Sequence, residues 1–348
     1  MSEGDGGGGD DEGSDIGTAN TMRGRADESR LKVRLLLQTN RLVVTGAFAL
    51  FIFAGFIAFS VFLAPSLDAE ITSSDTIETI FSTMISVLVT GTTLVITINQ
   101  LVLSQENGPL GDQRERMSDA MDFRTYAKDL LGQSVPADPS AFLQALVRET
   151  ERRSEVLDRL VADSDDEELR EQVTEFVDSI HGNAQEVEDE FDGASFGTFD
   201  VLFAALNFNY SWKIYQVERI TGEFDDSLTD DQKRAFEDLR TSLSMFGPAR
   251  EHIKTLYFQW ALVNLSQYIL YVAVPALLVA GVMLTFVGAE TFGSTQFLDV
   301  PVITWVVSGA FTLTLIPFLL FTSYILRIAT VAKRTLAIGP LILRDSQR

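Results

Sequence analysis

The amino-acid sequence predicts an all-α protein with four transmembrane helices and a cytoplasmic helical bundle inserted between the second and third of them. Three observations predict this fold. Four apolar runs, at about 42–64, 78–103, 259–287 and 301–326, each reach the roughly 20 residues that a helix needs to cross a bilayer. None of these runs contains Lys or Arg, and the polar stretch between the second and third runs repeats its apolar residues at helical spacing.

The distribution of Lys and Arg predicts the orientation of the spans. Six of the 27 basic residues precede the first span, sixteen lie between the second and third, and five follow from Arg327 onward. The short loops at 65–77 and 288–300 contain none, although they carry acidic residues such as Asp75 and Glu290. Basic residues are retained on the cytoplasmic side. We therefore expect a multi-pass protein of the cell membrane with both termini in the cytoplasm.

Composition divides the chain further, from its N-terminus to its C-terminus. Residues 1–25 are acidic and Gly-rich and lack the apolar surface that would offset ordering, which predicts a disordered tail. Residues 26–41 mix basic and apolar side chains, which fits an amphipathic juxtamembrane helix or a simple positive flank. The remaining predicted boundaries are 42–104 for transmembrane helices 1 and 2, 105–258 for the cytoplasmic helical domain, 259–327 for transmembrane helices 3 and 4, and 328–348 for a cytoplasmic tail.

The first helices of the central segment have recognisable boundaries. Gly108 and Pro109 separate the second span from a polar helix predicted at about 112–131. Asp138 followed by Pro139 is typical of a helix start, because proline is tolerated at the first helical position.

A near-heptad apolar stripe predicts the next helix at 166–192, and an aromatic helix at 196–221 follows it. Residues 194–210 are apolar enough to suggest a fifth span. Such a span would place Asp200 near the middle of the bilayer, at a cost of about 2.5–3.5 kcal/mol. It would also invert the orientation of everything downstream. We therefore interpret it as the buried helix of a soluble domain.

The last helix of the central segment is predicted from a capping pattern. Thr229 and Gln232 resemble a capping box for a helix over 230–245, and Gly247 with Pro248 is expected to end that helix.

The net charge is −22, and only six of the basic residues are Lys. Most of the excess lies in the central segment, where 34 acidic residues face 16 basic ones. Binding to nucleic acid is therefore not expected. The chain contains no Cys, which excludes disulfides, iron–sulfur clusters and thiol catalysis.

The most selective feature is a continuous polar stripe along the second span. Its members recur in steps of three and four residues and fall within an arc of about 80° on a helix. They are Asp75, Thr79, Ser82, Ser86, Thr90, Thr93, Thr97, Gln100 and Ser104. Lipid offers such groups no hydrogen-bonding partners, so the stripe is expected to face protein or a wet cavity. The residues predicted to line a pathway are Ser82, Ser86, Thr90, Thr93, Thr97 and Gln100.

A second set of polar residues is expected near the cytoplasmic side of the membrane. Asn99 lies there on the second span, and Asn264 and Gln267 lie at a similar depth on the third. The fourth span adds Thr304, Ser308 and Thr312 in its outer half.

Three interpretations of the stripe remain open. Small polar residues let helices approach closely, so the stripe can mark a packing seam. It can instead line a wet pathway in an oligomer, since Ser82 to Ser104 covers about 33 Å at 1.5 Å per residue. A cleft for a ligand or a lipid is the third interpretation.

Catalytic chemistry has little support in this chain. His181 and His252 lie far apart without a metal-binding partner pattern, and acidic runs such as 165–168 are typical of solvated helix starts. No nucleotide-binding or nucleophile motif is present. We therefore expect no enzyme activity, no catalytic residue, no cofactor and no bound metal.

The end of the second span, from Gln100 through Ser104 and Gln105 to Pro109, resembles a stretch of an uncharacterised family of prokaryotic multispan integral membrane proteins. That resemblance implies a membrane protein and assigns no activity. The acidic, Lys-poor composition is similar to that of proteins from salt-loving archaea.

Two functions follow as hypotheses. The first is an oligomeric channel or transport-like protein whose pathway is lined by the stripe. The alternative is a non-transporting membrane scaffold or sensor whose cytoplasmic helices bind a protein partner. In either case the lipid bilayer is a partner, and a homo-oligomer is expected.

Overall fold

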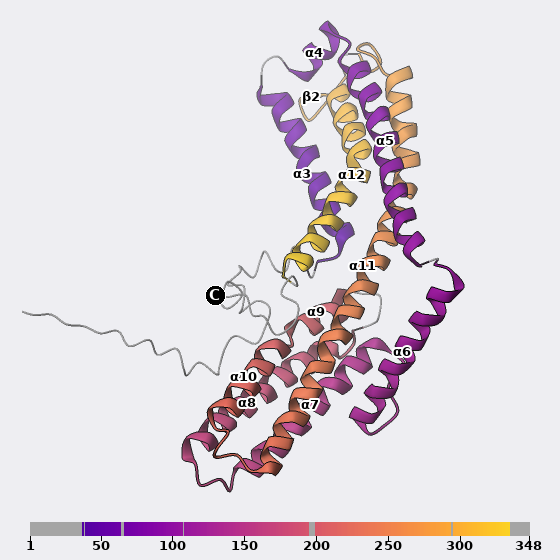
Figure 1. Ribbon diagram of the computed structural model, residues 1–348. Helices are drawn as coiled ribbons and strands as arrows, with labels where there is room; N and C mark the ends of the chain where they lie inside the picture. Colours follow the sequence, from indigo (N-terminus) through magenta and orange to yellow (C-terminus); the bar gives the residue numbers. More distant parts are fainter. Residues whose placement is uncertain are drawn as a thin grey trace, which may run out of the picture. The chain divides into compact units, whose positions relative to one another are not determined.

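The computed structural model is helical apart from one small hairpin in the residues that it describes (Figure 1). These are 37, 39–63, 66–106, 108–194, 199–293 and 295–334. The predicted tail 1–25, most of the segment 26–41 and the end of the tail 328–348 lie outside them. The described chain forms two compact units. Unit 1 contains residues 117–257, and unit 2 contains residues up to 116 together with 258–334.

Four of the described helices are long and apolar enough to cross a membrane, the same number as the predicted spans. They are α3 (Arg41–Phe62), α5 (Thr76–Glu106), α11 (Asp230–Phe286) and α12 (Val302–Arg334).

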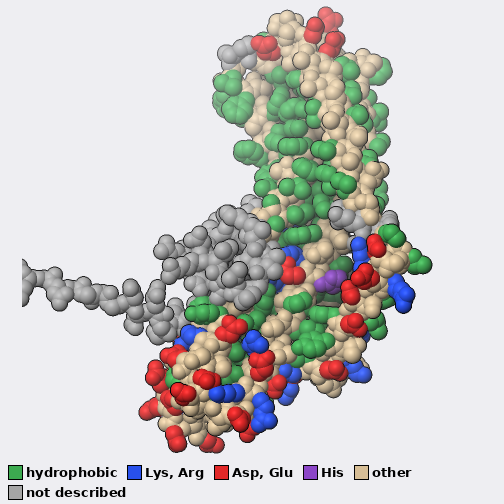
Figure 2. All heavy atoms as spheres, in the orientation of Figure 1, with side chains coloured by type: hydrophobic (Ala, Val, Ile, Leu, Met, Phe, Trp, Pro, Cys, Tyr) green, Lys and Arg blue, Asp and Glu red, His purple; other side chains and the backbone are tan. Residues whose placement is uncertain are grey.

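Unit 2 is organised around α12, the most buried of these four helices. Helix α3 packs along it, and the hydroxyls of Thr45 and Ser323 meet at 3.1 Å in this contact. Helix α5 packs against α12 on another side through residues such as Phe81, which is fully buried. In the face that Figure 2 shows, apolar side chains cover the membrane-length helices of this unit, and acidic side chains gather at the end that carries α4 (Leu67–Ser73).

The connection between α11 and α12 contains a hairpin that the sequence does not predict. Strands β1 (Gln296–Phe297) and β2 (Val300–Pro301) pair antiparallel around Leu298 and Asp299. Both turn residues have positive φ, 53° for Leu298 and 59° for Asp299. This two-residue turn favours Asn-Gly, and the left-handed conformation costs an ordinary residue about 1–2 kcal/mol. Leu298 is therefore strained.

Unit 1 is a helical bundle with one continuous hydrophobic core. It comprises the larger part of α6 (Leu110–Leu131), α7 (Pro139–Val161), α8 (Glu167–Phe191), α9 (Phe199–Asn207), α10 (Tyr210–Glu223) and the first part of α11. The predicted start of α7 is confirmed, because the Asp138 side chain accepts from the Ala141 amide at 2.9 Å.

The predicted end of a helix at Gly247 and Pro248 is wrong, because α11 runs through both residues. A proline inside a helix costs about 3 kcal/mol because its N–H is missing. Here Pro248 is exposed. Ser244 is exposed as well, and its carbonyl receives no helical hydrogen bond because the proline at 248 has no N–H. Phe246 and Ala249 on the opposite side are buried in the core. Burial of this face offsets the local cost.

The capping box at the start of α11 is confirmed. The Thr229 amide donates to Oε1 of Gln232 at 2.9 Å, and the Gln232 amide donates to the Thr229 hydroxyl at 3.3 Å.

The predicted single helix at 196–221 is in fact two helices, α9 and α10, separated at residues 208–209. The side chain of Asn183 on α8 serves both ends of this break. Its amide donates to the Asn207 carbonyl at 2.9 Å, and its oxygen accepts from the Asn209 amide at 3.3 Å. Helix α9 is nine residues long and largely buried, so it forms part of the unit 1 core and is too short for a fifth span.

Candidate functional site

The polar stripe lies on the exposed side of α5. The helix packs into unit 2 through Ile77, Phe81, Leu88 and Val95, all buried. These residues are centred about 160° around the helix from the stripe, at 100° per residue. The exposed stripe members are Asp75, Thr79, Ser82, Ser86, Thr90, Thr93, Thr97, Gln100 and Ser104. Among the described helices, the stripe is therefore not a seam within one chain.

Five hydroxyls of the stripe donate hydrogen bonds to carbonyls of their own helix. Ser86 donates to the Ser82 carbonyl at 3.3 Å, Thr93 to the Val89 carbonyl at 2.9 Å, and Thr97 to the Thr93 carbonyl at 2.9 Å. Ser82 and Ser104 donate to carbonyls three residues earlier, at 3.2 and 2.8 Å. A hydroxyl has one hydrogen and two lone pairs. These five oxygens consequently present acceptor lone pairs outward.

Two charged residues lie at the start of α5, where the stripe begins. Asp75 and Glu78 are both exposed. The sequence from 42 to 113 contains acidic residues and no Lys or Arg. The potential along this helix is therefore negative at its N-terminal end and neutral along the stripe.

The residues of the expected cytoplasmic-side layer differ in their exposure. Asn99 lies on the packed side of α5 and is half-buried, as is Asn264 on α11, whereas Gln267 is exposed. No hydrogen bond joins these three side chains in the described structure. The Asn99 side-chain oxygen is buried without a hydrogen-bonding partner.

The predicted polar residues of α12 are buried, whereas those of the α5 stripe are exposed. Thr304, Ser308 and Thr312 are all buried within unit 2. Ser308 donates to the Thr304 carbonyl at 2.6 Å. Small polar residues of this kind allow close helix packing. Spacing alone does not distinguish this buried row from the exposed stripe, because both repeat at helical intervals.

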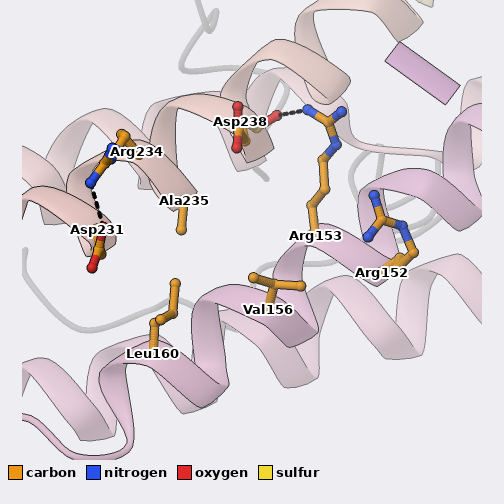
Figure 3. A pocket seen from close by; sticks show the side chains of 8 residues that line it. All are labelled: Arg152, Arg153, Val156, Leu160, Asp231, Arg234, Ala235 and Asp238. Carbon is orange, nitrogen blue, oxygen red and sulfur yellow. Dashed lines mark hydrogen bonds and ion pairs between the residues drawn. The ribbon is translucent and has the colours of Figure 1, made fainter. Parts of the chain in front are cut away.

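A groove in unit 1 runs between α7 and α11 and has a volume of about 330 Å³ (Figure 3). It contains three arginines, but they already have partners. Arg153 donates to the Asp238 carbonyl at 2.6 Å, Arg234 pairs with Asp231, and Arg152 binds Glu149. Because these arginines already donate hydrogen bonds within the protein, the groove is a weak candidate for an anion site.

Sequence reasoning missed a buried polar network in unit 1. Lys213 is only 1% exposed, and its ammonium donates to Oδ1 of Asn183 at 2.9 Å and lies 5.3 Å from the Phe208 ring centroid. Asn207 donates to both carboxylate oxygens of Glu190, at 2.9 and 2.7 Å. Burial raises the pKa of Glu190, the Asn207 hydrogen bonds lower it, and the net pKa lies above its usual range. The only indication of this network in the sequence was the presence of Lys213 in the aromatic helix predicted at 196–221.

The two histidines remain apart. His181 contacts a Glu151 carboxylate oxygen at 2.5 Å and Gln185 at 2.8 Å on the surface of unit 1. Within the described ranges, no group of His, Asp and Glu side chains is arranged to hold a metal ion.

A model for one protein family matches residues 8–348, nearly the whole chain. The chain belongs to the DUF7972 family. This family is described as one of unknown function, in agreement with the resemblance to an uncharacterised family. No curated protein and no solved structure matches this DUF7972 member.

Proposed function

We propose that this DUF7972 protein is an integral membrane protein that forms a homo-oligomer, in which the α5 stripes of several copies line a hydrated pathway. Both termini and unit 1 lie in the cytoplasm in this proposal, as the positive-inside rule predicts. The observation that carries the proposal is the exposure of the whole stripe on the outside of a single chain. A polar row of bilayer length that faced lipid would find no hydrogen-bonding partners there. Another copy of the chain or water is therefore expected to cover it.

The direction of the hydroxyl groups favours cations in such a pathway. Outward lone pairs can replace part of the hydration of a cation, as acceptor oxygens do in cation-selective channels. The exposed acidic residues Asp75 and Glu78 would raise the local concentration of cations at one end. Anions would meet no basic side chain along the stripe.

Thiol labelling of single Cys substitutions tests the pathway, and the chain has no native Cys to interfere. The structure supplies two classes of control. Val87 and Leu94 are 56% and 59% exposed but lie off the stripe, whereas Leu88 and Val95 are buried. A membrane-impermeant reagent applied to intact vesicles should label Cys at positions 86, 90, 93 and 97 only.

Two results would contradict the pathway. Protection of the stripe together with disulfide cross-linking between copies would identify a dry seam. Equal labelling at 87 and 94 would mean that α5 does not lie in lipid at all.

The alternative is a scaffold or sensor whose unit 1 binds a protein partner. The observation that favours it is the exposure of Met117 and Met121, 65% and 54%, one turn apart on α6. Methionine-rich surfaces are typical of adaptable protein contacts. If Met121→Ser abolished association with a co-purified protein while stripe variants had no effect, the scaffold would be the better hypothesis.

A further inference from the structure

The hairpin between α11 and α12 exposes two large apolar side chains at its tip. Phe297 is 59% exposed and Leu298 is 73% exposed. The strand pairs Gln296–Pro301 and Phe297–Val300 close directly behind them. Within the described residues of unit 2, more than half of each side chain remains exposed.

The hairpin is fixed to the helices by aromatic contacts. The Trp305 indole N–H donates to the Phe297 carbonyl at 3.2 Å, and the two rings pack edge-to-face with centroids 5.7 Å apart. Trp305 also packs on Phe53 of α3, at 6.1 Å. The position of Phe297 is therefore determined relative to both α3 and α12.

These contacts place the tip at the level of apolar helix rather than beyond it. Phe53 lies nine residues before the end of α3 at Phe62. That separation corresponds to about 13 Å along a helix. The two ring distances together are shorter than this rise, so Phe297 lies no farther out than the end of α3.

The backbone at Leu298 supports a role for its side chain. Its φ of 53° is a conformation that glycine or asparagine adopts at lower cost. A leucine that stayed in water would bring no compensation for this strain. Burial of the side chain among apolar groups would compensate for it, because the transfer of a Leu side chain out of water is favourable.

We propose that Phe297 and Leu298 insert into the bilayer and anchor this end of α12 to the lipid. The ligand is the acyl-chain region beneath the headgroups, with Trp305 at the interface, where aromatic side chains concentrate. Asp299 follows in the turn and can reach the headgroup layer. Since residues 288–326 contain no Lys or Arg, the anchor should not depend on anionic headgroups. This proposal rests on the spans alone and is independent of a pathway.

Fluorescence quenching in vesicles tests the anchor. The full chain with Leu298→Cys carries an environment-sensitive fluorophore and is reconstituted into phosphatidylcholine vesicles, with and without phosphatidylglycerol. Phe51→Cys, at a site on α3 that is 78% exposed, provides the lipid reference, and Ser74→Cys, at the exposed end of α4, provides the aqueous one. Position 298 should match Phe51 and be quenched by nitroxide-labelled lipid several-fold more than Ser74. Phosphatidylglycerol should make no difference.

Three results would overturn the proposal. The first is iodide quenching at 298 as strong as at Ser74, and the second is quenching by lipid only when phosphatidylglycerol is present. The third is protection from both quenchers with cross-linking between copies, which would identify a protein contact.

A second variant keeps the test valid if the label disturbs the turn. In the Asp299→Cys chain, Leu298 remains in place, and the Leu298→Gly substitution is then added as the comparison. Removal of the leucine side chain should increase iodide accessibility at 299 several-fold. Unchanged accessibility would show that Leu298 does not hold the tip in lipid.

Discussion

At the residue scale, one arginine of unit 1 connects three helices, and a carboxylate on its own helix holds it in place. Glu149 on α7 accepts from Arg152 at 2.6 Å and from Arg153 at 2.7 Å. Arg153 also donates to the carbonyls of Leu130 on α6 and Asp238 on α11. One guanidinium thus connects three helices. Because its geometry depends on Glu149, this carboxylate is the residue whose loss should matter most.

We predict that Glu149→Gln destabilises unit 1 by about 1–3 kcal/mol, since it removes hydrogen bonds between charged groups. Burial raises the pKa of Glu149, but Arg152 and Arg153 outweigh burial and hold that pKa below its usual range. The stabilisation is therefore complete above the unfolded pKa of about 4.3 and is lost as the pH falls through the lower folded value.

Thermal unfolding of the detergent-solubilised chain measures this difference. The control is Glu155→Gln, which removes an exposed ion pair with Arg159 and should have little effect. Equal shifts in Tm for the two variants would contradict the stabilising role of Glu149.

Glu190 should show the opposite pH dependence, because its folded pKa is raised. Between its usual pKa of about 4.3 and the raised value, the folded state holds more protons than the unfolded state, so stability falls as the pH rises. Glu190→Gln should remove this contribution, and its Tm relative to the parent should increase from pH 4 to pH 7. Asp189→Asn, at the exposed neighbouring position, should show no such trend.

At the scale of single elements, tertiary contacts decide where helices continue and where they end. Helix α11 continues through Gly247 and Pro248 because one of its faces is buried in the core. The chain breaks between α9 and α10 because the Asn183 side chain bonds both ends of the break. In each case a group distant in sequence outweighs the local preference.

Two of the helical glycines, Gly247 and Gly182, should respond oppositely to alanine. A Cβ at Gly247 would lie 3.0–3.1 Å from the Tyr210 ring, which also stacks on Arg250 at 4.8 Å. Crowding of a packed core costs about 1–3 kcal/mol, so Gly247→Ala should lower Tm. Gly182 in α8 has nothing within 4 Å of its Cβ position, and alanine there should stabilise by about 0.5–1 kcal/mol. A gain in Tm for Gly247→Ala would show that the Tyr210 ring moves aside without an energetic cost.

At the scale of the whole molecule, the exposed stripe on α5 is expected to organise copies of the chain. We predict that Thr90→Leu and Thr93→Leu abolish cation conductance in planar bilayers, because each would replace a hydroxyl in the pathway by an apolar side chain. The control is Leu94→Ile, a conservative change at an exposed position beside the stripe. Retained conductance in both Thr variants, with normal assembly, would exclude the stripe as the pathway.

The apolar length of four segments determined the membrane-length helices by itself, since any helix that long and apolar must avoid water. Local chemistry likewise determined the start of α7 and the capping box at α11, because each involves residues three positions apart. Only the tertiary structure decided that the stripe of α5 is exposed while the equally regular row Thr304, Ser308 and Thr312 is buried. Helical spacing specifies that residues share a face, whereas the neighbouring helices determine which way that face points.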